Sequence, residues 1–304
     1  MGGTTKFCFR PLLRNENAVW SLDEGFFYFS FTKETMIMLK RLLVIALAVV
    51  ALAAAGCGGG DKKAETTIKV GATAGPHAEV VEAAAKEAAK SGLKVQVVEF
   101  SDYVTPDKAL ADGELDLVSY QHKPFLDNFN KTNKTDLVPV GNAILMRMGI
   151  YSDKVHDVKN IPDGATIAIP NDPTNGGRGL LLLERAGLLK LKAGVGMKAT
   201  PKDVVENPKH LQFKELEAAQ LPRSLADVDA AAITMNYVMS GGLDVKKQNI
   251  FLEPKDEPLA VMIIAARAKD KDKAEYKEFV KAYQSEAVKK FIAEKYKGTI
   301  EPAF

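Results

Sequence analysis

From Thr67 onward, segments with the alternating apolar pattern of strands are separated by segments with the periodicity of amphipathic helices. Residues 68–71 predict a short strand, and residues 77–90 predict a helix that begins after Gly75-Pro76. Repeated alternation of this kind favours an α/β architecture with parallel sheets. Ligands of such sheets bind at the carboxyl ends of the strands. The chain is therefore predicted to carry its site where several strands end.

The same pattern continues to the end of the chain. Further strands are predicted over residues 95–100, 115–120, 137–140, 211–216, 230–234 and 260–266. One long amphipathic helix is predicted over residues 274–297.

Residues 167–191 predict a strand, a polar turn and a helix. Ile167 and Ile169 alternate as in a half-buried strand, and Asp172-Pro173 is a favourable helix start. Arg178 lies in or beside the first turn, so its guanidinium and the positive end of the helix dipole are expected to meet one small anion, such as a carboxylate. From this stretch alone, an ordinary loop with a solvated arginine remains open. We expect replacement of Arg178 to leave folding nearly unchanged.

The first 66 residues are predicted to lie outside the folded domain. Residues 36–56 resemble a bacterial lipoprotein signal peptide, with a charged start at Lys40-Arg41, an apolar segment and the cleavage site Ala-Ala-Gly-Cys ending at Cys57. Cys57 then becomes the lipidated first residue, residues 57–66 form a flexible tether, and residues 1–35 lie upstream of the true start at Met36 or Met38. The expected location is the cell membrane, facing the periplasm or the exterior. A plain secretory peptide or a short anchor helix is the alternative.

Composition argues against several classes of function. Removal of residues 1–56 leaves 35 basic and 35 acidic residues, so the net charge of +2 belongs to the removed segment, and no basic stripe indicates nucleic acid binding. Cys8 and Cys57 are the only cysteines, which excludes a disulfide framework in the mature chain. The four histidines lack metal-ligand spacing, no serine lies in a nucleophile elbow, and the glycine pattern at residues 194–199 runs into Pro201. We therefore predict no catalytic residue, metal or cofactor, and no enzyme.

Six sequence runs carry a resemblance to a known family. These are Gly-Ala-Thr-Ala-Gly-Pro-His-Ala-Glu (71–79), Phe-Ser-Asp-Tyr-Val (100–104), Tyr-Gln-His-Lys-Pro-Phe-Leu-Asp (120–127), Ile-Pro-Asn-Asp-Pro-Thr-Asn (169–175), Val-Glu-Asn-Pro (205–208) and Leu-Pro-Arg-Ser-Leu (221–225). They resemble the NlpA/MetQ family of methionine-binding lipoproteins, over nearly the whole mature chain.

The resemblance implies a two-lobe α/β fold of the type II periplasmic-binding-protein kind. Lobe 1 is expected to comprise residues 67–148 and 257–304, and lobe 2 residues 149–256. By the resemblance, the cleft between them captures L- or D-methionine, or a closely related apolar amino acid, for the membrane subunits of an ABC importer. A methionine-containing dipeptide or another small zwitterion remains open as the ligand. A hydrolase and a non-transport surface lipoprotein are the other classes.

The resemblance also assigns roles to four residues. It implies that Tyr103 and Tyr120 line the side-chain pocket, that His122 is a polar contact, and that Arg178 binds the ligand carboxylate. Core packing is the alternative for the two tyrosines, and a structural role is the alternative for His122.

Two positions depart from the family pattern. Thr234 stands where the family commonly has an asparagine, and Asn236 is the candidate to replace that amide. Met262 stands at a second position that is often asparagine. With Met146, Met148 and Met235, it forms either an adaptable apolar wall or ordinary core filling.

Overall fold

The computed structural model describes residues 12–14, 17–19 and 66–304. The chain divides into two compact units, residues 1–62 and residues 63–304. In the first unit, strand β1 (Leu12–Arg14) pairs antiparallel with β2 (Asn17–Val19). The predicted signal peptide, Cys57 and the tether up to residue 65 lie outside the described residues. Among the described residues, no helix has both the length and the apolar character needed to cross a membrane.

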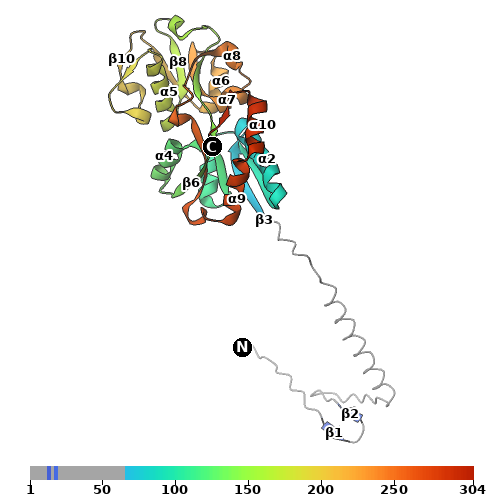
Figure 1. Cartoon of the computed structure of the whole chain (residues 1–304). Helices are drawn as coiled ribbons and strands as arrows, with labels where there is room; N and C mark the ends of the chain where they lie inside the picture. The colour runs from blue at the N-terminus through green and yellow to red at the C-terminus, as the bar shows by residue number, and fades with distance from the viewer. Residues whose placement is uncertain (1–11, 15–16, 20–65) are drawn as a thin grey trace, which may run out of the picture. The chain divides into compact units, whose positions relative to one another are not determined.

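The second unit contains a six-stranded sheet covered by helices on both faces (Figure 1). Its strands, in spatial order, are β15 (Glu301–Pro302), β6 (Leu137–Leu145), β14 (Val261–Arg267), β5 (Leu117–His122), β3 (Thr66–Thr73) and β4 (Leu93–Phe100). Packed together on one face are α2 (Pro76–Ala88), α9 (Ala274–Tyr283) and α10 (Glu286–Tyr296). The other face carries α3 (Thr105–Asp112) and α4 (Lys123–Asn133).

A five-stranded sheet forms the other half of this unit. Its strands, in spatial order, are β11 (Gln212–Leu216), β8 (Thr166–Pro170), β12 (Ala230–Thr234), β7 (Met148–Tyr151) and β13 (Asn249–Leu252). Its helices are α5 (Pro173–Arg185), α6 (Leu221–Ser224), α7 (Met235–Ser240) and α8 (Val245–Gln248). A short antiparallel pair, β9 (Lys190–Leu191) and β10 (Val204–Glu206), lies beyond α5.

The predicted α/β alternation is confirmed, but both sheets are mixed rather than parallel. β3 runs parallel to β4 and β5, and β8 runs parallel to β11 and β12. β14 lies antiparallel between β5 and β6, and β7 lies antiparallel between β12 and β13. The reason is geometric. β7 and β14 begin at the junction between the two sheets, whereas the parallel strands run toward that junction. Strand and helix patterns alone do not reveal that direction.

The chain passes between the two sheets twice. The first connection is short, since β6 ends at Leu145 and β7 begins at Met148. The second spans residues 253–260, between β13 and β14. The two connections are hydrogen-bonded to each other, because Met146 N donates to the Ala260 carbonyl (2.7 Å) and Glu253 N donates to the Met148 carbonyl (3.0 Å). The division of these halves into lobes at the predicted boundaries remains a proposal.

The strand, turn and helix predicted over residues 167–191 are confirmed as β8 and α5. Asp172 is the N-cap of α5, where its Oδ1 accepts from Asn175 N (2.8 Å), and Pro173 is the first helical residue. Gly177 admits the neighbouring loop, because a Cβ atom there would lie 2.1 Å from the Met197 carbonyl oxygen. Arg178 lies in the second turn and is buried.

The single long helix predicted at the C-terminus is wrong. α9 ends at Tyr283, and a new helix, α10, begins at Glu286. Ser285 caps α10 by accepting from Val288 N (3.3 Å), which favours a new helix start over continuation of α9.

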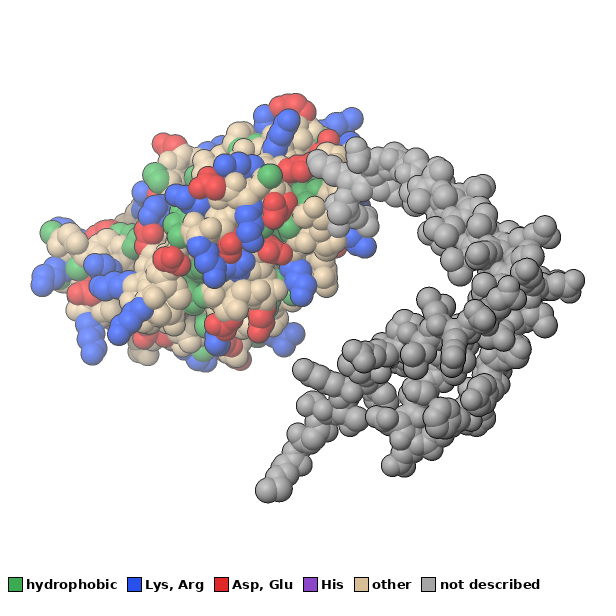
Figure 2. Space-filling model, turned by 90° about the horizontal axis from the view of Figure 1, so that it is seen from below, with side chains coloured by type: hydrophobic (Ala, Val, Ile, Leu, Met, Phe, Trp, Pro, Cys, Tyr) green, Lys and Arg blue, Asp and Glu red, His purple; other side chains and the backbone are tan. Residues whose placement is uncertain are grey.

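Acidic and basic side chains are interspersed over the face of the molecule drawn in Figure 2.

Candidate functional site

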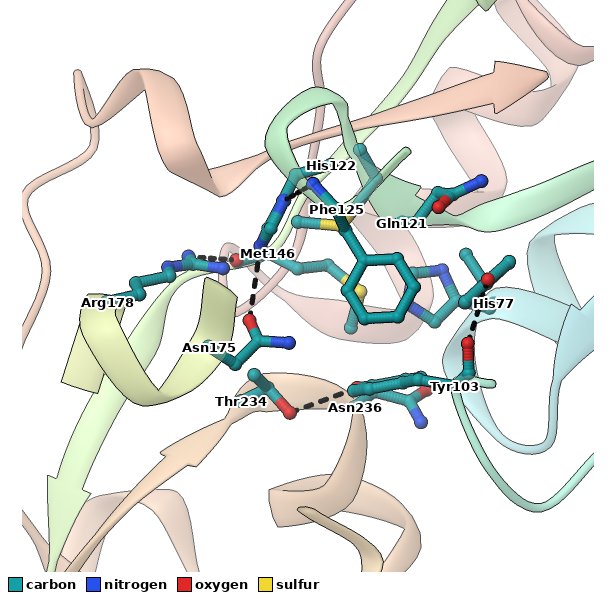
Figure 3. A pocket seen from close by; sticks show the side chains of 12 residues that line it. His77, Tyr103, Gln121, His122, Phe125, Met146, Asn175, Arg178, Thr234 and Asn236 are labelled. Atoms are coloured by element: carbon teal, nitrogen blue, oxygen red, sulfur yellow. Dashed lines mark hydrogen bonds between the residues drawn. The ribbon is translucent and has the colours of Figure 1, made fainter. Parts of the chain in front are cut away.

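A cavity lies where β5, β8 and β12 end, between the two sheets (Figure 3). It is lined from both halves by His77, Tyr103, Tyr120, Gln121, His122, Phe125, Met146, Asn175, Arg178, Thr234, Asn236 and Met262. All six residues predicted to bind a ligand therefore line one cavity, although their individual roles remain predictions. Carboxyl ends of strands converge there, as the α/β pattern predicts.

Aromatic rings form one wall of the cavity. The Tyr103 ring lies 5.9 Å from the Tyr120 ring and 6.3 Å from the Phe125 ring, between centroids. The Tyr120 hydroxyl donates to the Tyr103 backbone carbonyl (2.9 Å), which ties the Tyr120 side chain to the segment that carries Tyr103. Met146 and Met262 add thioether groups to the lining. A flexible apolar side chain, in particular one containing sulfur, packs favourably against such a surface.

Of the four methionines considered from the sequence, two do not line the cavity. Met148 and Met235 lie in the hydrophobic cores. Met146 and Met262 line the cavity and also belong to the hydrophobic core, so the adaptable wall stays a prediction for these two.

His122 connects the two halves through both ring nitrogens. Its Nδ1 accepts from Phe125 N (3.1 Å) as the cap of α4, so the proton lies on Nε2, which donates to Asn175 Oδ1 (3.1 Å). Burial, with a smaller effect from the Arg178 guanidinium, lowers the pKa of His122 to about 3. The imidazole is therefore neutral at physiological pH. Both nitrogens are engaged within the protein.

Arg178 forms a buried ion pair with Glu253, a residue that the sequence interpretation missed. Arg178 Nε donates to Glu253 Oε1 (2.8 Å) and Nη2 to Oε2 (2.6 Å), while Nη2 also donates to the Met146 carbonyl (3.1 Å). Only 2% of the arginine and 4% of the glutamate side chain are exposed. Glu253 therefore occupies the edge of the Arg178 guanidinium formed by Nε and Nη2. Arg178 Nη1 bonds neither Glu253 nor Met146 and can donate to another acceptor.

The expectation that Arg178 is dispensable for folding rested on a solvated first helical turn. The structure contradicts that premise, because the side chain is buried and joins α5 to both connections between the sheets.

Three cavity residues carry buried polar atoms without a hydrogen-bond partner among the protein groups of residues 66–304. These atoms are His77 Nδ1, Gln121 Oε1, and both Oδ1 and Nδ2 of Asn236. Buried polar atoms in folded proteins are almost always satisfied. Burial also lowers the pKa of His77 to about 3, so its ring is neutral. The cavity thus offers two acceptor oxygens, one amide donor and one histidine nitrogen, whose role depends on the tautomer, to a polar ligand.

Thr234 is committed to a protein contact. Its Oγ1 lies 3.0 Å from the Tyr103 hydroxyl, which joins the end of β12 to the other half of the molecule (Figure 3). Asn236, two residues later at the start of α7, is 1% exposed and has the free amide. Thr234, which departs from the family pattern, and Asn236, the candidate to replace the missing amide, thus have different surroundings.

The sequence interpretation missed several residues of the lining. They are His77, Gln121, Phe125 and Asn175. Each lies at a helix start or a strand end that the patterns located, so proximity to these ends is the signal that points to them. Within the described part of the chain, no group of three or more His, Cys, Asp or Glu side chains can hold a metal ion.

The fold and the cavity together define a substrate-binding protein built from two α/β halves. The sequence profile of the NlpA lipoprotein family matches residues 68–304. The chain belongs to this family.

Named relatives and solved structures are similar over most of the chain. A Vibrio cholerae protein named "Probable D-methionine-binding lipoprotein MetQ" is 46% identical over 262 residues, covering 86% of this chain and 96% of the relative. The Escherichia coli K12 D-methionine-binding lipoprotein MetQ is 45% identical over 252 residues, covering 82% and 92%. The structure of a nutrient binding protein from Burkholderia cenocepacia bound to methionine has a TM-score of 0.76 and 48% identity, covering 78% of this chain and 100% of that one.

Proposed function

We propose that this protein captures methionine in the cavity between its two halves and delivers it to the membrane subunits of an ABC importer. The observation that carries the proposal is the combination of an aromatic and thioether wall with unpartnered buried polar atoms in one cavity. Relatives that are similar over most of the chain are named as methionine-binding proteins, which supports methionine as the ligand. Binding rather than catalysis is then the activity.

The polar and apolar parts of the lining suit the two ends of a methionine zwitterion. The thioether side chain packs against Tyr103, Tyr120 and Phe125, where each sulfur–aromatic contact contributes ~0.3–1.5 kcal/mol. The charged end lies against Asn236 and the Nη1 edge of Arg178. In this arrangement Glu253 orients the guanidinium, and Arg178 binds the carboxylate with the edge that Glu253 leaves.

We propose that the two halves are lobes that close over the ligand by hinge motion. The two connections lie side by side, and contacts between the halves, such as Tyr103–Thr234 and His122–Asn175, border the cavity. Closure around a bound ligand buries it from water. Small-angle scattering with and without saturating methionine tests the motion, and identical profiles would contradict it.

We further propose that Cys57 anchors the protein to the membrane through a lipid and that residues 57–66 serve as a tether. The lipoprotein designation of the family and of its named relatives supports this location. It also places the binding domain beside the membrane subunits of an importer.

Calorimetry on the full-length protein, freed of bound ligand by unfolding and refolding, tests the function. The panel comprises L-methionine, D-methionine, norleucine, a methionine dipeptide and leucine. We expect saturable binding of methionine at one site and recovery of the amino acid unchanged. Turnover of a ligand would favour a hydrolase, and no binding across the panel would favour a non-transport surface lipoprotein.

A pair of asparagine variants separates binding from folding. Asn236→Ala removes an amide without a protein partner, so we expect affinity to fall about 10- to 100-fold with little change in stability. Asn130→Ala is the matched control, because the Asn130 amide bonds Leu137 and Thr135 within the protein. That variant should lose stability and keep its affinity. The opposite pattern would overturn the proposed site.

A further inference from the structure

A buried carboxyl group lies one layer behind the cavity. Asp107 in the first turn of α3 is fully buried, and its Oδ1 accepts a hydrogen bond from Gln121 Nε2 (2.5 Å). Gln121, 3% exposed, lines the cavity at the end of β5. In Figure 3 its amide nitrogen points away from the other drawn side chains. The amide therefore lies between the carboxyl group and the cavity.

No cationic side chain balances this carboxyl group among the ion pairs of residues 66–304. Its Oδ2 has no protein partner there, because the single proton of the nearby Tyr120 hydroxyl is donated to the Tyr103 carbonyl. The strands packed on α3 carry the titratable groups Lys69, Tyr120, His122 and Arg267.

None of these groups supplies a free positive charge. Lys69 is exposed, and Arg267 pairs with Asp270 and bonds carbonyls at the far end of α3. His122 is held neutral by burial, which lowers its pKa to about 3. On the approach to α3, Asp102 is acidic and caps the helix start. An ionised Asp107 is therefore uncompensated until a cation enters the cavity.

Burial raises the pKa of Asp107 to about 7, against the opposing effect of the hydrogen bond from Gln121. When the carboxyl group is ionised, its bond to Gln121 Nε2 polarises the amide and strengthens Oε1 as an acceptor. That oxygen has no partner among the described protein groups. An ammonium group has three donors and no acceptor. Gln121 Oε1 and Asn236 Oδ1 are the unpartnered acceptor oxygens of this lining.

We infer that Gln121 accepts a hydrogen bond from the ligand ammonium group and that Asp107, as a positioning residue, supplies the negative charge behind it. The inference rests on the proposed function, since it concerns the amino end of the same ligand. Binding of the ammonium favours the ionised carboxylate, so a proton leaves Asp107 when ligand binds near neutral pH. Affinity therefore rises as the pH increases through about 7 and levels off above it.

The test is calorimetry of L-methionine binding to the full-length protein between pH 5.5 and 8.0, in buffers of different ionisation enthalpy. The carboxylate of a free amino acid keeps its ammonium protonated over this range. For the unmodified protein we expect Kd to be roughly tenfold weaker at pH 5.5 than at pH 8.0, with proton release near pH 7. This measurement needs no variant. Methionine binding with a flat Kd and no proton release would overturn the inference and leave the proposed function intact.

Two variants assign the effect to the proposed residues. Asp107→Asn should remove both the pH dependence and the proton release, whereas Asp112→Asn, at an exposed carboxylate of the same helix paired with Lys108, should preserve both. Gln121→Leu should weaken binding at every pH. Proton release that persists in Asp107→Asn would overturn the inference. Absence of methionine binding at every pH would overturn the proposed function, and the inference with it.

Discussion

Replacement of Arg178 by alanine is expected to destabilise the protein as well as weaken binding. The change removes two charge-assisted hydrogen bonds to Glu253 and one to the Met146 carbonyl. Glu253 is left as a buried carboxylate whose remaining partner is the backbone N–H of Met148 (2.6 Å). A buried ion pair broken from one side typically costs ~3–5 kcal/mol, because one charge stays buried without compensation. We expect a loss of that size in the free energy of unfolding.

Urea denaturation followed by circular dichroism measures this loss, since the midpoint shifts while the slope stays constant for a two-state unit. The double variant Arg178→Met, Glu253→Met removes both charges and retains apolar volume, so it should recover most of the stability. Arg185→Ala is the matched control, because its pair with Glu257 is largely exposed on the arginine side and contributes ~0–1 kcal/mol. A loss below ~1 kcal/mol for Arg178→Ala, or no recovery in the double variant, would refute the reasoning.

Three further predictions concern titration and processing. The imidazole NMR signals of His122 should not titrate between pH 5 and 8, because burial lowers its pKa to about 3; a midpoint near 6.5 would contradict the buried contact with Asn175. Because the pKa of Asp107 is raised from 3.8 to about 7, its contribution to stability is complete below pH 3.8 and is lost as the pH rises through 7. Asp107→Asn should therefore reduce the fall in unfolding free energy between pH 5 and 8, by up to about 3 kcal/mol, and an unchanged slope would contradict this. Mass spectrometry of membrane-extracted protein should find lipidated Cys57 as the first residue, and peptides containing Trp20 would exclude it.

The sequence located the elements of the site better than their interactions. The start of α5 was predictable because Asp172-Pro173 supplies a cap and a fixed backbone angle locally. Tyr103, Tyr120 and His122 were assigned to one site by the family resemblance, and the convergence of strand ends in α/β folds agrees with that assignment. The helix start needed only neighbouring residues, whereas the site residues needed the family motifs.

Glu253 was not predictable because its partner lies 75 residues away. It belongs to a connection without helical or strand periodicity, and its burial depends on how the two connections lie together. Asp107 was missed for a different reason. An acidic residue in the first turn of a helix is common on surfaces, and only the packing of α3 on the sheet buries this one.

The break between α9 and α10 had a local signal, since Ser285-Glu286 is a favourable helix start. The apolar periodicity continues across the break and obscures it. The antiparallel strands β7 and β14 had no such signal, because their direction depends on the path of the chain between the sheets.

The two connections between the sheets differ in length, and this has a mechanical consequence. The first leaves only Met146 and Arg147 between β6 and β7, whereas the second contains residues 253–260. Glu253 is held by Arg178 and Met148, so the part of the second connection that can change its path lies after Glu253. In the proposed hinge motion, the short connection fixes the distance between the halves and permits mainly rotation about itself, while the longer one adjusts its path. Residues added after Glu253 would therefore preserve the axis of rotation, and a residue added between Met146 and Arg147 would displace it.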